Sequence, residues 1–108
     1  MNQQQINLWN RMRVLIRKKK RKFQNRKDRN IYEDLNKLGL SVTDAWNEIL
    51  TLNKNMFVID NKPFYNQSKN SLTFKKKIKY KLAYIKLMLD ENDEVVVCWS
   101  FHEDNDKS

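Results

Sequence analysis

The chain of 108 residues contains only one glycine, one cysteine and one histidine. A single glycine argues against the glycine-rich loops that bind nucleotide phosphates in many enzymes. A single cysteine, Cys98, can form neither an internal disulfide nor a cysteine-based zinc site within one chain. The sequence also shows no cluster of metal ligands and no Ser-His-Asp arrangement. We therefore expect neither a metal nor a cofactor, and we interpret Cys98 as a small buried side chain.

Long apolar segments are missing as well. The longest uninterrupted apolar run covers residues 95–99 and has the length of a strand, whereas a helix that spans a membrane needs about 20 apolar residues. Near the N-terminus, residues 14–16 are the only apolar run ahead of a basic segment, which is too short for the apolar region of a secretory signal. We therefore expect a soluble, cytoplasmic protein without a membrane partner.

Positive charge, in contrast, is abundant. The chain has 22 Lys and Arg against 13 Asp and Glu, a formal net charge of +9. Such an excess predicts a polyanionic partner: a nucleic acid, an anionic membrane or an acidic protein. Half of the basic residues lie within residues 11–29. This segment could be a solvated helix face, a membrane-surface helix, a dock for an acidic partner or an RNA-contacting arm, and we favour RNA because its apolar stripe is short.

Hydrophobic spacing predicts helices in the first half of the chain. Apolar residues recur at helical spacing over residues 7–22, which contain no helix breaker. A second helix is predicted over residues 29–38, and it ends at Gly39, where a left-handed cap is expected. Ser41 and Asp44 have the spacing of a capping box that opens a third helix.

From residue 72 the apolar period changes to two. This pattern predicts strands over residues 72–78, 80–89 and 94–101. The order of elements predicts an α+β fold, with N-terminal helices packed on one face of a three- or four-stranded antiparallel sheet. We expect a single domain, residues 1–108, in which residues 7–28 form a basic helical extension and residues 29–104 form the core.

The last two strands each have a strongly apolar face and a mixed face. The apolar sets are Ala83, Ile85, Leu87 and Leu89 in one strand, and Val95, Val97, Trp99 and Phe101 in the other. Both sets can face the helices if the hairpin loop has an odd number of residues, such as the three residues 91–93. Ile85 then lies opposite Trp99, and Tyr84 lies opposite Ser100. The other face then gathers Tyr84, Lys86, Ser100 and His102, joined by Lys75 and Lys77.

A basic face with a phenol and an imidazole suits the cleavage of RNA without a metal. This reaction needs a base at the ribose 2′-hydroxyl, cations near the phosphorus and an acid at the leaving 5′-oxygen. His102, with an ordinary pKa of about 6.5, is our candidate for the acid. Tyr84, with an ordinary pKa of about 10, is a base only if nearby cations such as Lys75 lower its pKa, and otherwise it positions the phosphate.

Each of these residues also has a simpler interpretation. His102, beside Glu103, is typical of an exposed residue or a local ion-pair partner. Tyr84 is an ordinary strand aromatic in that view, and the lysines at 75–77 protect a sheet edge from aggregation. A non-catalytic nucleic-acid-binding module and a structural or host-interaction protein therefore stay open beside the enzyme.

Two pairs of segments carry a family resemblance. Residues 35–41 (LNKLGLS) and 45–52 (AWNEILTL) resemble the helical half of the MqsR-type mRNA interferases. Residues 84–89 (YIKLML) and 95–103 (VVVCWSFHE) resemble the closing hairpin of that family. The resemblance covers about residues 29–104. It implies a RelE-like fold and an endoribonuclease that cleaves mRNA as the toxin of a bacterial type II toxin–antitoxin system, with an antitoxin protein as partner and the ribosome as a further candidate.

The resemblance also implies site residues. The catalytic positions of the family match Tyr84, Lys75 and His102, although other members have Lys at the last of these. A further family lysine is missing here after the third helix, with Lys62 or Lys69 as candidate substitutes. Among the basic residues, those that we expect to contact RNA are Lys86, Lys77, Lys62, Arg17, Lys18 and Arg21.

Overall fold

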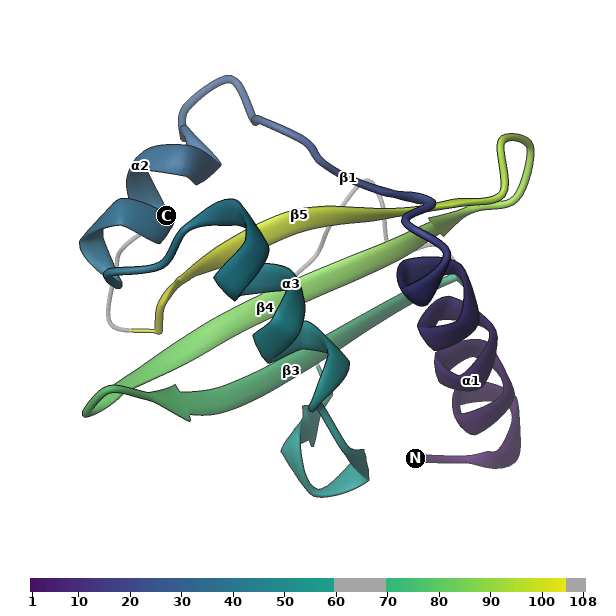
Figure 1. The fold of residues 1–108 in the computed structure, drawn as a ribbon. Helices are drawn as coiled ribbons and strands as arrows, with labels where there is room; N and C mark the ends of the chain where they lie inside the picture. The colour runs from purple at the N-terminus through teal and green to yellow at the C-terminus, as the bar shows by residue number, and fades with distance from the viewer. Residues whose placement is uncertain (60–69, 105–108) are drawn as a thin grey trace.

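Three helices and a five-stranded sheet make up the part of the chain that the computed structural model describes, residues 1–59 and 70–104 (Figure 1). The elements are α1 (Gln3–Arg17), β1 (Arg21–Phe23), α2 (Ile31–Lys37), α3 (Val42–Leu50), the short 3-10 helix η1 (Lys54–Met56), β2 (Phe57–Val58), β3 (Ser71–Ile78), β4 (Lys81–Asp90) and β5 (Val95–Glu103). The strand order is β1-β5-β4-β3-β2, and β1 runs parallel to β5 while the other pairs are antiparallel. The α+β class is confirmed, but the predicted antiparallel sheet of three or four strands is wrong.

The parallel strand comes from the basic segment. The predicted helix to residue 22 is wrong because α1 ends at Arg17 and the chain turns through Lys19, which has a left-handed φ of 61°. The turn delivers the carbonyl of Lys20 to the amide of Val96, 3.0 Å away. Phe23 then packs on Trp46 with ring centroids 4.7 Å apart, so tertiary burial rather than local preference sets this strand.

Local signals fix the ends of the helices. The Ser41–Asp44 capping box is present at the start of α3, as predicted. Gly39 has a φ of 71°, and the amide of Leu40 donates to the carbonyl of Leu35 at 3.0 Å, which closes α2 with a Schellman motif. A capping box between Asn2 and Gln5 starts α1 earlier than the apolar pattern indicated.

One face of the sheet is packed against the helices. Its core contains side chains from all three helices and from three strands, among them Trp9, Met12, Ile16, Leu35, Trp46, Ile49, Leu72, Phe74, Ile85, Leu87, Val96, Cys98 and Phe101. Trp9 of α1 contacts Phe74 of β3 with ring centroids 5.0 Å apart. The segment that the sequence set apart as an extension thus supplies core residues and an edge strand.

The β4–β5 hairpin differs from the prediction in its loop and in its register. Residues 91–94 form a four-residue turn, so Asp90 pairs with Val95 and Leu87 pairs with Cys98. A β-bulge then leaves Trp99 unpaired, and Lys86 pairs with Ser100. Val96 and Cys98 therefore face the helices, and the predicted apolar set of Val95, Val97 and Trp99 is wrong.

The bulge explains why the predicted faces of Phe101 and His102 are nevertheless correct. An even loop alone would turn Phe101 to the other face, but the extra residue reverses the alternation a second time. Phe101 consequently pairs with Ile85 in the core, while Tyr84 pairs with His102 rather than with Ser100.

The described helices include none that is both long and apolar enough to cross a membrane.

Candidate functional site

Lys75, Tyr84 and His102 form a continuous row across β3, β4 and β5. Lys75 pairs with Tyr84, and Tyr84 pairs with His102. Their strand neighbours Phe74, Ile85 and Phe101 lie in the core, so the row lies on the face away from the helices. The two rings stack with centroids 5.2 Å apart and an interplanar angle of 24°. The sheet thus brings the three expected catalytic residues together.

A second row on this face contains Thr73, Lys86 and Ser100. Thr73 and Lys86 line a pocket of about 180 Å³ together with Ser71 and residues of α1 and β2. Lys86, Ser100 and His102 are each only 4% exposed. The part of this face around Lys86 and His102 is therefore polar but shielded from solvent.

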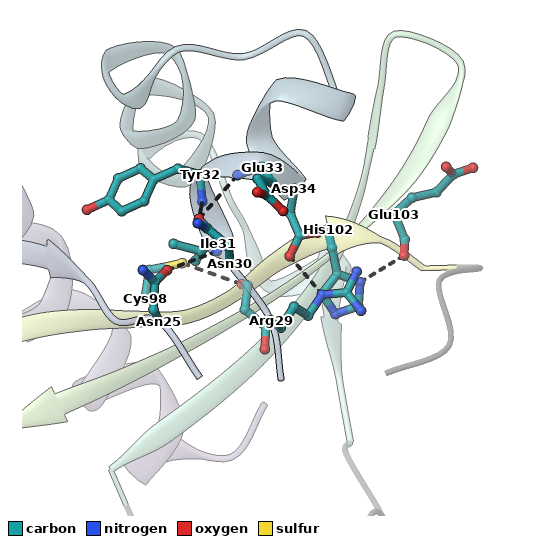
Figure 2. Close-up of polar contacts among 11 residues, drawn as sticks. Asn25, Arg29, Asn30, Ile31, Tyr32, Glu33, Asp34, Cys98, His102 and Glu103 are labelled. Carbon is teal, nitrogen blue, oxygen red and sulfur yellow. Dashed lines mark hydrogen bonds and ion pairs between the residues drawn. The ribbon is translucent and has the colours of Figure 1, made fainter. Parts of the chain in front are cut away.

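The surroundings of His102 favour a neutral ring of one tautomer. Nδ1 lies 2.8 Å from the carbonyl oxygen of Glu103, which can only accept, so Nδ1 carries the hydrogen (Figure 2). Burial lowers the pKa of His102 below its ordinary value, and the charges of Arg29 and Arg26 lower it further, although the Glu103 bond and Asp34 oppose the shift. A neutral ring with a hydrogen on Nδ1 presents Nε2 as a proton acceptor.

An ion pair lies next to His102. Arg29 Nε donates to Asp34 Oδ2 at 2.7 Å, and the two side chains are 13% and 7% exposed. Figure 2 shows this bond, with the end of the Arg29 side chain overlapping the ring of His102 in the view. Asn30 caps α2 by accepting from the amide of Tyr32, which fixes the start of the helix that carries Asp34. The pair thus joins the loop before α2 to the helix itself, and both charges act on His102 at the end of β5.

The lysines of β3 differ in their surroundings. Lys75 Nζ lies 3.1 Å from Asp104 Oδ2, and its side chain is 37% exposed. Lys77 is exposed and pairs with Leu82, which puts it on the same face as Lys75. Lys76 points to the helix side, where it bonds Glu48 of α3 at 2.7 Å. Lys75 is therefore the lysine of this strand that borders the Tyr84 ring.

The other expected RNA contacts do not join this site. Arg17 and Lys18 are exposed at the end of α1, next to the β1 residues that pair with Val96. Val96 lies six positions before His102 in β5, which corresponds to about 20 Å along a strand. Arg21 lies over the Trp46 ring at 5.2 Å on the helix side, and Lys62 lies outside the described residues.

The sequence interpretation missed Arg26, Arg29 and Asp34. One signal was available, because Asp34 stands at helical spacing from Ile31 and Leu38 on the buried face of α2. An acid at such a position indicates a buried partner of opposite charge. No pattern in the sequence shows that this partner would lie beside His102.

Cys98 has no role in this site. Its side chain is fully buried on the core side, its Sγ donates to the carbonyl of Ser100 at 3.4 Å, and burial raises the pKa of its thiol. The interpretation as a small buried side chain is confirmed. Within the described ranges, no group of three or more His, Cys, Asp or Glu side chains could hold a metal ion.

Comparison with known proteins finds neither a family model nor a curated protein that matches this chain.

Proposed function

We propose that this chain is an endoribonuclease with a RelE-like fold, and that it acts on mRNA as the toxin of a type II toxin–antitoxin pair. The observation that carries the enzymatic part is the row of Lys75, Tyr84 and His102, in which a phenol and an imidazole stack at 5.2 Å beside an ammonium group. The net charge of +9 supports an anionic substrate. The toxin, its antitoxin partner, ribosome contact and a cytoplasmic location rest on the resemblance of residues 29–104 to the MqsR-type interferases.

The tautomer of His102 supports a different assignment of roles from the one expected from the sequence. As a neutral ring with a free lone pair on Nε2, His102 serves as the base that removes the proton from the 2′-hydroxyl. The 2′-oxygen attacks the phosphorus, the bond to the 5′-oxygen breaks, and the products are a 2′,3′-cyclic phosphate and a 5′-hydroxyl. The Tyr84 phenol gives its proton to the leaving 5′-oxygen, and Lys75 stabilises the charge that develops on the phosphate.

A non-catalytic RNA-binding module is the second candidate. The burial of His102, with 4% of its surface exposed, and the pairing of Lys75 with Asp104 at 3.1 Å favour it. A substrate would have to reach Nε2 along a shielded face. Binding without cleavage needs no such access.

A cleavage assay separates the two candidates. Purified protein is incubated with end-labelled RNA in EDTA, and the product ends are identified. We expect cyclic phosphate ends, and a decrease in rate of about 100-fold or more in His102→Gln and Tyr84→Phe, the range typical of general acid–base groups. Lys54→Gln, at an exposed lysine of η1, is the control and should keep the wild-type rate.

Two results would contradict the proposal. Intact RNA with tight binding favours the module, and full activity in both site variants removes the assigned residues from the reaction. The toxin role is tested separately, by expression in bacteria. Growth arrest by the wild type but not by His102→Gln, relieved by the product of an adjacent reading frame, is the expected result.

A further inference from the structure

The turn between β1 and α2 holds two arginines with opposite electrostatic surroundings. Arg26 and Arg29 exchange backbone hydrogen bonds of 3.1 and 3.3 Å, so both side chains leave the same short turn. Arg29 bonds Asp34 at 2.7 Å. Arg26, in contrast, has Nε and Nη2 shielded from solvent without a hydrogen-bond acceptor among residues 1–59 and 70–104. Among the described residues, Arg29 thus has an acidic partner, whereas these two donors of Arg26 have no acceptor.

The position of Arg26 is fixed on both sides of the turn. On one side, the amide of Gln24 donates to the carbonyl of Cys98 at 3.0 Å, which holds the chain along the edge of β5. On the other, the amide of Ile31 donates to Asn25 Oδ1 at 3.0 Å. The turn therefore lies beside the part of β5 that continues to Ser100 and His102. The charge of Arg26, after burial and the charge of Arg29, contributes to the lowered pKa of His102, in agreement with this placement.

A shielded guanidinium without an acceptor is unfavourable in the free protein, because desolvated donors have lost water without gaining a partner. Nε and an Nη atom together form the fork that binds two oxygens of one phosphate. An anion at this position would complete the hydrogen bonds that the fold leaves open. Arg29 cannot take this role because Asp34 already occupies its Nε.

We infer that Arg26 is a phosphate-binding residue, and that its ligand is an RNA phosphodiester next to the one cleaved at Tyr84 and His102. The choice of RNA as the source of the phosphate rests on the proposed function. Arg26 acts as a binding residue that holds the strand in register, and it does not take part in the transfer of protons.

The test measures binding of an RNA oligonucleotide with 2′-O-methyl groups, which cannot be cleaved because it has no free 2′-hydroxyl. Arg26→Gln should weaken binding about tenfold, the loss expected for a charged hydrogen-bonded contact. It should also reduce the slope of log K against log salt by about 0.7, the value for one phosphate of a single strand. Arg26→Lys keeps the charge but loses the two-pronged hydrogen-bond donor, so its affinity for the oligonucleotide should lie between those of the wild type and Arg26→Gln.

Lys27→Gln is the matched control. Lys27 is exposed in the same turn and the change in net charge is identical, so we expect it to weaken binding less than about twofold. Equal weakening in Arg26→Gln and Lys27→Gln would reduce the effect to net charge and overturn the inference. Unchanged binding in Arg26→Gln would overturn it as well.

Thermal unfolding gives a second readout. Because Nε and Nη2 of Arg26 have no acceptor among the described residues, Arg26→Gln should melt at the same temperature as the wild type or higher. The oligonucleotide should raise the melting temperature of the wild type more than that of Arg26→Gln. A melting temperature well below the wild type would mean that Arg26 holds the fold and would refute the inference. The two proposals can also fail separately. If binding depends on Arg26 but the protein does not cleave ordinary RNA, only the proposed ribonuclease activity is refuted. If the protein cleaves RNA but binding does not depend on Arg26, only the phosphate subsite is refuted.

Discussion

Phe101 and His102 are neighbours in β5, yet they lie in opposite environments. Phe101 is fully buried among the helices, where an apolar ring gains from leaving water. His102 is 4% exposed on the other face, stacked on Tyr84 and close to two arginines. Both side chains are removed from water, but only the burial of Phe101 is stabilised by the hydrophobic effect. A titratable ring that is buried although it gains no hydrophobic stabilisation is typical of functional sites.

Insertion of one alanine between Ser100 and Phe101 should have the largest effect on this contrast between the faces. With the bulge kept, the added residue moves Phe101 from its place opposite Ile85 to a place opposite Tyr84, so Phe101 and His102 exchange faces. Loss of a core phenyl together with burial of an imidazole among apolar side chains should lower the free energy of unfolding by at least about 5 kcal/mol. Urea unfolding of the insertion variant measures this. A stability equal to that of the wild type would mean that the register of β5 does not set the faces.

Phe101→Ala and His102→Gln compare the faces directly. We expect Phe101→Ala to lower the free energy of unfolding by about 3–5 kcal/mol, because it leaves a cavity in the core. His102→Gln should lower it by only about 1 kcal/mol, the value of one hydrogen bond. Chemical denaturation of both variants tests the comparison, which fails if the two losses are similar.

Asp34→Asn tests the ion pair at the edge of the sheet. Removing the carboxylate takes a buried ion pair from the shielded Arg29 side chain, so we expect a loss of about 2–3 kcal/mol in the free energy of unfolding. Asp28→Asn, at an exposed acid in the preceding turn, is the control and should change stability by less than about 0.5 kcal/mol. Equal effects of the two changes would show that the Arg29 pair contributes nothing of its own.

The pH dependence of stability should show the smallest effect. The pKa of His102 is lowered in the folded protein, so below about pH 6.5 the unfolded chain binds a proton that the folded chain does not. The free energy of unfolding therefore decreases as the pH falls from about 6.5 to the folded pKa, and this contribution is constant at lower pH. The difference between wild type and His102→Gln, measured by denaturation between about pH 5 and pH 8, isolates it. No difference in slope would contradict the lowered pKa.

The pH dependence of RNA cleavage tests whether His102 acts as the base or as the acid. A base must be neutral, so RNA cleavage should lose rate as the pH decreases through the folded pKa of His102. An acid at this position would produce the opposite trend. The pH profile of Tyr84→Phe, measured beside that of the wild type, shows whether the acidic limb belongs to His102.

The sequence by itself determined the features that depend on near neighbours in the chain. The Ser41 cap and the left-handed Gly39 follow from backbone groups within a few residues. The alternation in β3 and β4 put Phe74 and Ile85 on one face and Lys75 and Tyr84 on the other, because side chains of a strand point alternately to its two faces.

Only the tertiary structure decided the rest. The parallel pairing of β1 with β5, the bulge at Trp99 and the approach of Arg29 to His102 join segments whose partners are set by packing and hydrogen bonding at long range. A basic run such as residues 17–22 has no alternation that favours a strand, and a bulge changes which face is buried without a local signal in the sequence. That Lys75, Tyr84 and His102 share one face could therefore be predicted, but the shielding of the histidine, the two arginines near it and its charge state could not.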